Sequence, residues 1–367
     1  MSTNQNKNKN HIYFMRLALE QAKKVLGNTK NNPAVGCVIT KNNHVISAGH
    51  TSINGRPHAE HNAINLPKKN FEGSELYVTL EPCSHYGKTP SCVNAIIKSG
   101  IKRVFFSSKD PDPRSYNKST ELFKKNKIVA KNGILYLDIR NFYKSYIKYK
   151  ENTLPFVTAK MAVSKDFYTI NRKKKWITNI YSRGRVHLMR SKHDCILTAV
   201  NTIITDNPRL TCRILGLEDK SPSRIILDKS LKIPLSSYVV KSAHKYRTFV
   251  FFNKMNQKKI KILKRFKVKL IQTPLNKDNE FDLKELLAKV RDLGFSRIFL
   301  ETGIKLTNNF LDNDLVDVFH LFISKKNLGT NGKNNFKNLM RVYFKKKKFF
   351  KEKVNLFDDK FISYHIK

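Results

Sequence analysis

The chain has few acidic residues, few cysteines and no long apolar segment, and each shortage narrows the possible classes of protein. No stretch of its 367 residues approaches the ~18 to 20 consecutive apolar residues of a membrane-spanning helix. The opening MSTNQNKNKN lacks the apolar core of a signal peptide, and its composition predicts a disordered polar lead over residues 1–10. We therefore expect a cytoplasmic protein without a membrane partner.

The five cysteines are an odd number in a long chain without a secretion signal, which argues against a disulfide framework. Metal ligation or plain burial explains them better. They are Cys37, Cys83, Cys92, Cys195 and Cys212.

Acidic side chains are scarce, because 28 Asp and Glu face 71 Lys and Arg and leave a formal net charge of +43. Such an excess is typical of proteins that bind polyanions such as nucleic acids. The lysines are nevertheless scattered along the whole chain and accompany many Asn, Ile and Phe residues. Codons for these residues are rich in A and T, so drift in an A/T-rich genome explains the same balance. We expect no nucleic-acid partner.

Two successive regions alternate helical and extended patterns, as a chain of this length allows. In the first region, apolar residues at three- and four-residue steps predict a helix over about 11–26. Strands of this region are predicted at 34–40, 44–49, 75–80 and 102–107. This alternation indicates an α/β layer with helices packed on a mixed sheet.

A second series of alternating helical and extended patterns begins at ENTLPFVT (151–158), and we place the domain boundary near residue 150. The clearest helices of the second region span about 179–191 and 281–293. Its candidate strands lie at 156–162, 194–199, 224–228, 248–252, 268–272, 297–301 and 317–323. Buried strands separated by helices predict a second α/β domain with a largely parallel sheet, a layout often used to bind nucleotides.

Four residues of the first region form a pattern typical of a catalytic zinc site. Zinc prefers imidazole and thiolate ligands, and a catalytic zinc keeps three protein ligands and one water position. His58, Cys83 and Cys92 supply one nitrogen and two sulfurs. Glu60 stays off the metal, where a carboxylate can take a proton from water and pass it to a leaving amine. The set matches the zinc-deaminase signature except for its cysteine spacing.

This interpretation requires a particular start for the helix that carries the glutamate. Residues two apart on a regular helix point about 200° from one another. His58 and Glu60 therefore serve one site only if His58 lies at the helix entrance, which Pro57 favours. The alternative, a structural zinc with His85 as the fourth ligand, leaves Glu60 without a role.

Eight residues separate Cys83 from Cys92, where nucleoside and tRNA deaminases have two. With this spacing, NPAVGCVI (32–39), PHAE (57–60) and YVTLEPCSHYGKTPSC (77–92) closely resemble the bifunctional riboflavin-biosynthesis deaminase/reductase family. The segments KWIT, DCILTAVNTIITDNPRLT, RIILD and FLETGIKL continue the resemblance, which extends from about residue 11 to about residue 325.

The resemblance implies a cytidine-deaminase-like three-layer α/β domain over 11–150 and a dihydrofolate-reductase-like α/β domain over 151–367. The first would hydrolyse, with Zn²⁺, the 2-amino group of 2,5-diamino-6-ribosylamino-4(3H)-pyrimidinone 5′-phosphate. The second would use NADPH to reduce the ribosyl group, giving 5-amino-6-ribitylaminouracil 5′-phosphate. The partner is then a small phosphorylated pyrimidine, and a homo-oligomer is expected because the family commonly self-associates.

The family's contacts also carry over to individual positions of this sequence. The substrate-binding residues implied in the deaminase are Asn32, His85, Lys88 and Asp110. Those implied in the reductase are Arg190, Leu210, Arg213 and Glu301. The cofactor-binding residues implied are Lys160, Val163, Trp176, Thr178, Thr202, Asp206, Thr302 and Gly303. Arginine suits a phosphate because its planar fork binds two oxygens.

The sequence departs from the family at several positions, most of them in the reductase. Lys165 and Phe167 replace a leucine and a glycine, Lys174 replaces a serine and Asn207 replaces an aspartate. The loop 114–119 lacks the glycine that the family usually has there. An intact deaminase with a weakened reductase is therefore one alternative. A tRNA deaminase and a non-enzymatic zinc protein are the others, and the intact Glu60 argues against the last.

Overall fold

The computed structural model divides the chain into two compact units, Met1–Thr153 and Leu154–Lys367. It describes residues 2–66, 70–87, 90–151, 153–345, 349–350 and 354–367. The division lies close to the boundary expected near residue 150. Among the described residues, no helix combines the length and the apolar character needed to cross a bilayer.

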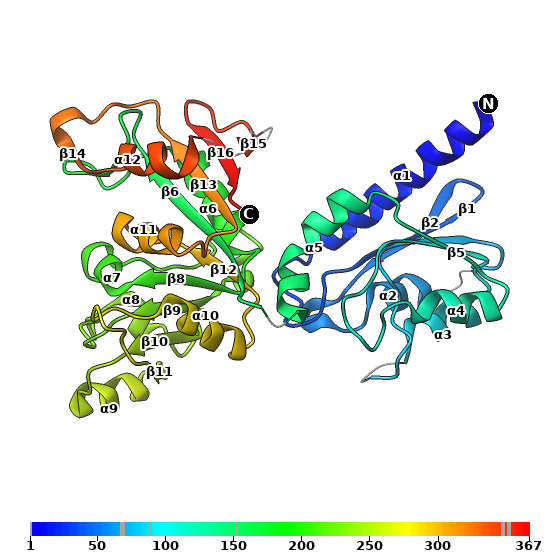
Figure 1. Ribbon diagram of the computed structural model, residues 1–367, viewed down its shortest axis with the longest axis horizontal. Helices are drawn as coiled ribbons and strands as arrows, with labels where there is room; N and C mark the ends of the chain where they lie inside the picture. Colours follow the sequence, from blue (N-terminus) through cyan, green and yellow to red (C-terminus); the bar gives the residue numbers. More distant parts are fainter. Residues whose placement is uncertain (1, 67–69, 88–89, 152, 346–348, 351–353) are drawn as a thin grey trace. The chain divides into compact units, whose positions relative to one another are not determined.

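The first unit is built on a mixed five-stranded sheet in the order β2-β1-β3-β4-β5. The strands are β1 (Gly36–Lys41), β2 (His44–His50), β3 (Glu75–Leu80), β4 (Arg103–Ser108) and β5 (Val129–Asn132). β1 runs antiparallel to β2 and β3, whereas β3, β4 and β5 are parallel. The central strands β1, β3 and β4 are short and largely buried because helices cover both faces of the sheet (Figure 1).

Helices α1 and α5 lie on one face of this sheet, and α2, α3 and α4 on the other (Figure 1). Their bounds are α1 (Ser2–Lys23), α2 (Ala59–Ile64), α3 (Cys92–Lys98), α4 (Lys118–Lys125) and α5 (Tyr136–Lys150). The three layers confirm the expected α/β class. One expectation differs from the structure: α1 begins at Ser2, where the polar composition predicted a disordered lead over residues 1–10.

Close packing of α1 on the sheet depends on a glycine. A Cβ atom at Gly36 in β1 would lie 1.9 Å from the carbonyl oxygen of Ala18. Only a residue without a side chain lets the two elements approach so closely. The core between them contains Met15, Ala18 and Cys37, all fully buried.

The second unit contains a nine-stranded sheet in the order β11-β10-β9-β8-β12-β6-β13-β16-β15. The strands are β6 (Phe156–Val163), β8 (Cys195–Ala199), β9 (Ser223–Leu227), β10 (Thr248–Phe252), β11 (Lys269–Gln272), β12 (Arg297–Leu300), β13 (Val318–Ile323), β15 (Phe349–Phe350) and β16 (Lys360–His365). The first seven in this order are parallel, and β16 and β15 add an antiparallel edge. The largely parallel sheet is as expected.

Helices connect the parallel strands of the second unit, and its hydrophobic core lies on both faces of the sheet. The helices are α6 (Ile180–Arg190), α7 (Val200–Asp206), α8 (Tyr238–Lys241), α9 (Gln257–Arg265), α10 (Leu283–Asp292), α11 (Ile304–Asp312) and α12 (Lys337–Leu339). A separate ribbon pairs β7 (Tyr168–Asn171) with β14 (Gly332–Asn335). The sequence patterns did not predict this ribbon or β16.

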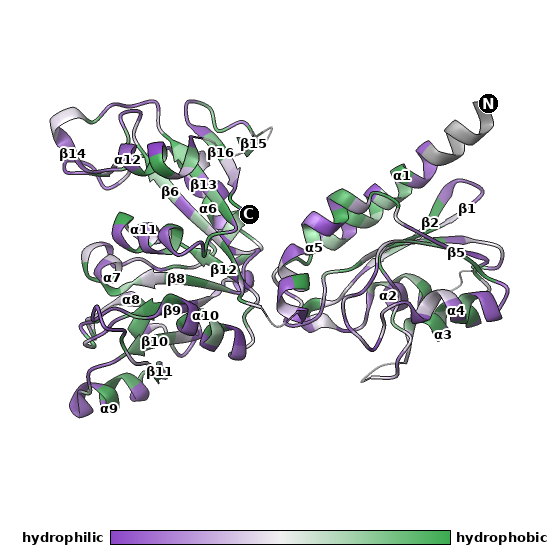
Figure 2. Ribbon diagram, in the orientation of Figure 1, coloured by the Kyte–Doolittle hydropathy of each residue, from purple (hydrophilic) through white to green (hydrophobic). Residues whose placement is uncertain are grey.

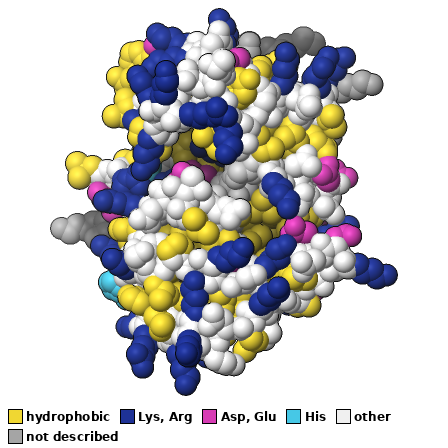
Figure 3. Space-filling model, turned by 90° about the vertical axis from the view of Figure 1, so that its left-hand side faces the viewer, with side chains coloured by type: hydrophobic (Ala, Val, Ile, Leu, Met, Phe, Trp, Pro, Cys, Tyr) yellow, Lys and Arg dark blue, Asp and Glu magenta, His cyan; other side chains and the backbone are white. Residues whose placement is uncertain are grey.

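Hydropathy and charge follow the layers of the second unit. The central strands are hydrophobic, whereas helix surfaces and loops are largely hydrophilic (Figure 2). On the face of this unit seen in Figure 3, Lys and Arg side chains are widely spread and outnumber the acidic ones.

Candidate active sites

The local structure of the first unit places His58 at the start of a helix. His58 is the N-cap residue of α2 with an extended backbone (φ −73°, ψ 164°), and Glu60 lies in the first turn. The imidazole therefore leaves the chain before the helix begins, as a site shared with Glu60 requires. Cys83 follows β3, and Cys92 is the first residue of α3, whose N-cap Ser91 accepts a hydrogen bond from the Asn94 N–H.

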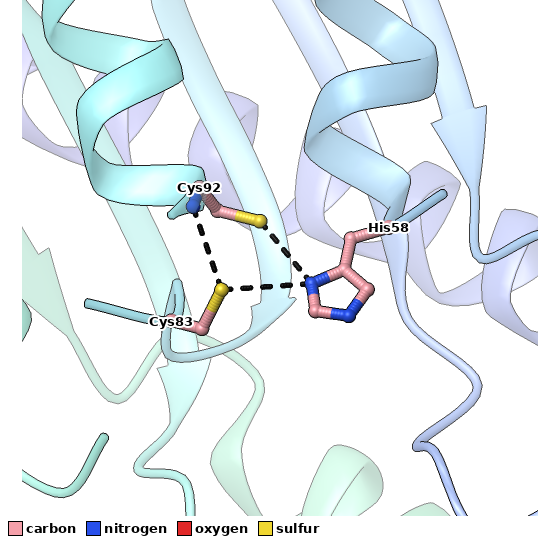
Figure 4. A group of neighbouring side chains, drawn as sticks. All are labelled: His58, Cys83 and Cys92. Atoms are coloured by element: carbon pink, nitrogen blue, oxygen red, sulfur yellow. Dashed lines mark hydrogen bonds between the residues drawn. The ribbon is translucent and has the colours of Figure 1, made fainter. Parts of the chain in front are cut away.

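The side chains of His58, Cys83 and Cys92 converge on one point (Figure 4). His58 Nδ1 lies 3.3 Å from Cys92 Sγ and 3.5 Å from Cys83 Sγ, and the Cys92 N–H donates to Cys83 Sγ at 3.4 Å. All three potential ligand atoms lie within 4.8 Å of one another. One imidazole nitrogen and two sulfurs in this arrangement fit the donor preference and size of a zinc ion.

The electrostatics of the cluster also suit a cation. The pKa of Cys83 is lowered, because hydrogen bonds from Cys92 and His58 stabilise the thiolate. Burial raises the pKa of Glu60 to about 7, although the nearby His58 opposes this effect. The Glu60 side chain is buried close to His58 and Cys83.

A small cavity of about 60 Å³ opens next to these residues. His58, Glu60 and Cys83 line it, together with three of the expected substrate residues, which are Asn32, His85 and Asp110. Lys88 lies outside the described residues. The cavity is also lined by cationic and phenolic side chains that sequence reasoning missed, namely Arg56, Arg114, Tyr146 and Lys150.

Asp110 is fixed from two sides. The Tyr146 hydroxyl donates to Asp110 Oδ1 at 3.0 Å, and the Asp112 N–H donates to the same oxygen at 3.0 Å. Burial raises the pKa of Asp110 to about 6. The buried Glu81 accepts hydrogen bonds from the Asp110 and Asn117 N–H groups and from the Ser119 hydroxyl.

The loop without glycine follows this aspartate. Asn117 takes the left-handed conformation there (φ 59°), which asparagine adopts more readily than most residues. The backbone of the loop is thus held by Glu81 rather than by a glycine turn.

In the second unit, a buried ion pair links α6 to the end of β12. Arg190 donates to Glu301 through Nε at 3.0 Å and through Nη2 at 2.8 Å, and Lys160 Nζ lies 4.0 Å from Glu301 Oε1. Burial alone would raise the pKa of Glu301, but Arg190 and Lys160 outweigh it and lower the pKa to about 2. Three expected residues are therefore brought together in this cluster.

The loop with Leu210 and Arg213 joins the same cluster. Arg190 Nη1 donates to the carbonyl oxygen of Thr211 at 3.0 Å. Leu210 has a left-handed backbone (φ 54°). Its side chain is buried in the hydrophobic core of this unit. Arg213 is exposed at the surface. Partial desolvation of its guanidinium and the positive charge of Arg190 lower its pKa. Cations therefore outnumber the single Glu301 carboxylate here, which favours an anionic ligand.

A cavity of about 720 Å³ opens at the carboxyl ends of the parallel strands of this unit. Three expected cofactor residues, Thr202, Thr302 and Gly303, line it. Gly303 is the N-cap residue of α11, and a Cβ atom there would meet nothing within 4 Å. An open helix start beside a large crevice fits the pyrophosphate of a nicotinamide dinucleotide.

The other expected cofactor residues do not line this cavity. Val163 is fully buried in the core, and Lys160 belongs to the Glu301 cluster. Trp176 is 54% exposed and stacks under the Arg183 guanidinium at 5.0 Å. The Thr178 carbonyl accepts a hydrogen bond from Arg183, and Asp206 is exposed at the end of α7.

Two of the substituted positions of the reductase have a left-handed backbone. Phe167 adopts the left-handed conformation (φ 67°) that a glycine would adopt without strain, and its ring packs on the core. Asn207 ends α7 in the left-handed conformation, and its side-chain oxygen accepts the Tyr238 N–H at 2.8 Å. The Lys174 side chain is exposed.

Comparison with known proteins covers both units. Residues 8–108 match the cytidine and deoxycytidylate deaminase zinc-binding region, and residues 155–354 match the RibD C-terminal domain. The riboflavin biosynthesis protein RibD of Aquifex aeolicus is 36% identical over 318 residues, 86% of this chain and 87% of that protein. RibD of Actinobacillus pleuropneumoniae is 32% identical over 331 residues, 90% of this chain and 87% of that protein.

Solved structures agree with these matches. The diaminohydroxyphosphoribosylaminopyrimidine deaminase/5-amino-6-(5-phosphoribosylamino)uracil reductase of Thermotoga maritima superposes with a TM-score of 0.84 at 30% identity, covering 98% of this chain and 100% of that chain. RibD of Acinetobacter baumannii gives a TM-score of 0.82 at 28% identity, covering 98% and 99% of the two chains.

The matches extend through both units, which favours the deaminase/reductase interpretation over a tRNA deaminase or a non-enzymatic zinc protein. The chain therefore belongs to the RibD family of riboflavin biosynthesis, as a bifunctional enzyme in which a zinc-binding deaminase unit precedes a reductase unit.

Proposed function

We propose that the deaminase unit hydrolyses the 2-amino group of 2,5-diamino-6-ribosylamino-4(3H)-pyrimidinone 5′-phosphate and releases ammonia. The observation that carries this proposal is the convergence of three ligand atoms within 4.8 Å beside a cavity lined by Glu60. A zinc ion held by His58, Cys83 and Cys92 supplies the Lewis acidity that lowers the pKa of the attacking water.

Glu60 is the proposed proton carrier. It takes the proton of the attacking water at its carboxylate and delivers it to the departing amino nitrogen. Its burial excludes bulk water from this transfer. Asn32 and Asp110 provide an amide and a carboxyl group for the polar edge of the pyrimidine, and both line the same small cavity.

The substrate phosphate is assigned to the cationic side of this cavity. His85 lines it together with Arg114 and Lys150. Arg114 Nη2 and Lys150 Nζ both contact Asp112 Oδ2, at 2.7 and 2.8 Å, so a single carboxylate faces two cations. These two cations, together with Arg56, are the side chains of this lining that can contact a phosphate, which favours a phosphorylated substrate over a free base.

The reductase unit is proposed to reduce the ribosyl group to a ribityl chain. A bound NADPH supplies the hydride from its dihydronicotinamide ring. Thr302 and Gly303 at the start of α11 hold the cofactor, and Arg190 and Arg213 bind the substrate phosphate. Lys160 and Glu301, whose charged atoms lie 4.0 Å apart, contact the sugar from the same side. We also propose a homo-oligomer, on the family resemblance alone.

The test uses the purified, zinc-loaded protein with the diaminopyrimidine ribosyl phosphate, and follows ammonia release and NADPH oxidation in parallel. Ammonia release followed by NADPH oxidation is the expected result. A substrate without its phosphate serves as the control and should show a raised KM in both reactions. Failure to release ammonia from the phosphorylated substrate would contradict the proposed deaminase activity.

A further inference from the structure

One rim of the 720 Å³ cavity carries an ion triad that none of the roles above uses. Glu280 precedes α10 and accepts from two lysines: Lys229 Nζ lies 3.0 Å from Oε2, and Lys305 Nζ lies 3.2 Å from Oε1. Lys229 also donates to the carbonyl oxygen of Asn279 at 2.7 Å. Two ammonium groups are thereby gathered at one place by a single carboxylate.

Five charged side chains line this cavity. They are Asp228, Lys229, Lys232, Glu280 and Lys305. The Asp228 carboxylate already accepts the Lys232 and Ile233 N–H groups, each at 2.8 Å, so it is committed to its own loop. Glu280 is therefore the carboxylate of this lining that exchanges partners most readily, and two lysines occupy it.

The order of strands places this rim at the adenosine end of a dinucleotide. Lys160 on β6 and Glu301 after β12 mark the reacting end. The starts of α7 and α11 follow β8 and β12, and Lys229 follows β9. From β6 to β9 there are three strand spacings, about 14 Å, so a ligand that reaches both ends is elongated. The pyrophosphate then lies at the start of α11, and the adenosine ribose beyond it.

We propose that Lys229 and Lys305 bind the 2′-phosphate of NADPH, displace Glu280 from their ammonium groups in doing so, and thereby make the reductase select NADPH over NADH. The inference rests on the proposed reductase function. A site that prefers NADH presents a free carboxylate to the ribose 2′-hydroxyl. Here the carboxylate is neutralised, and the two ammonium groups offer the charge that a phosphate dianion requires.

The test measures binding by calorimetry on the full-length protein, with adenosine 2′,5′-bisphosphate, adenosine 5′-diphosphate, NADPH and NADH as probes. Lys229→Met and Lys305→Met keep most of each aliphatic stem but remove the charge. Each is expected to weaken NADPH and the 2′,5′-bisphosphate by about tenfold and to change NADH and the 5′-diphosphate by less than about twofold. Glu280→Gln is expected to strengthen the 2′,5′-bisphosphate.

Lys289→Met is the matched control, because Lys289 pairs with Glu285 at 2.9 Å on α10 but does not line the cavity. It should change none of the four affinities, and thermal unfolding checks that every variant is folded. An equal loss of NADH and NADPH in the Lys229 and Lys305 variants would assign the lysines to the pyrophosphate and overturn the proposal. A wild-type protein that binds neither dinucleotide would instead overturn the proposed reductase function.

Discussion

The two active sites of this protein are built in different ways. The deaminase site is a cavity of about 60 Å³ beside three side chains whose ligand atoms lie within 4.8 Å of one another. The proposed reductase site comprises a cavity of about 720 Å³ at the ends of several strands, with the Lys229–Glu280 pair on its rim, and the Arg190–Glu301 pair, which lies outside the cavity lining. The first concentrates its chemistry in a few side chains, whereas the second distributes binding over backbone and charge. Single substitutions should therefore affect the first more severely.

The largest effect is expected for Glu60→Gln. Removing the proton carrier should slow ammonia release by about 10²- to 10⁴-fold. NADPH binding should be unchanged, because Glu60 belongs to the other unit. Glu72→Gln, on the surface of the same unit, is the control and should retain full activity. Normal ammonia release by the Glu60→Gln protein would show that Glu60 is not the proton carrier.

Cys83→Ala should abolish stoichiometric zinc binding, because two ligands are too few for a stable catalytic site. Atomic absorption of the purified protein measures this directly. Cys37→Ala is the comparison, since Cys37 is buried in the core outside the ligand group and its replacement should leave the zinc in place. If the Cys83 variant kept a full equivalent of zinc, another residue would have to be a ligand.

Gly303→Val should weaken NADPH binding by about tenfold or more, because the new side chain projects into the open space at the start of α11. Gly184→Val is matched to it, since a Cβ at Gly184 also meets nothing within 4 Å but that glycine lies on α6 away from the cavity. Calorimetric titration with NADPH distinguishes the two. Equal affinities in both variants would argue against a cofactor at this helix start.

Acid should destabilise the reductase unit through two partly buried histidines, His187 and His320. Burial lowers the pKa of His320 to about 3 and of His187 to about 4, below the unfolded value of about 6.5. The unfolded chain binds more protons in this window, so the stability present above about pH 6.5 is lost as the pH falls. For His320 alone the loss is about 2 kcal/mol between pH 6.5 and pH 5.

Trp176 is the chain's single tryptophan and lies in the reductase unit, so its fluorescence reports the unfolding of that unit. His320→Gln should make the midpoint of denaturant unfolding less dependent on pH than in the wild type. An unchanged pH dependence would mean that other groups control acid unfolding.

The smallest effect is expected for Phe167→Gly. Glycine relieves the left-handed backbone but loses the packing of the ring on the core, so stability should change by no more than about 1 kcal/mol. The reductase step should become somewhat faster if this position weakens it in the natural chain. Kinetics of the two half-reactions provide the measurement, and equal efficiencies in the wild type would refute the idea of a weakened reductase.

The sequence indicated the His/Cys/Cys metal ligands of the deaminase directly, whereas the contacts of the reductase stay predictions, for physical reasons. His58, Glu60, Cys83 and Cys92 are special residue types at narrow spacings, and metal chemistry leaves few other uses for them. In the reductase, threonine, glycine and lysine are ordinary surface residues, and their meaning depends on which strand ends they follow. Lys229 and Glu280 are 51 residues apart, and no local pattern indicates that they touch.

The sequence by itself determined the two α/β regions, the metal ligands and the family, because hydrophobic periodicity and ligand chemistry are local properties. Only the tertiary structure decided that Arg190, Lys160 and Glu301 meet in one cluster, and that α1 continues to Ser2. It also decided that the left-handed conformation persists at Phe167 without a glycine. These features depend on packing between distant segments, where burial and long-range pairing outweigh the preferences of single residues.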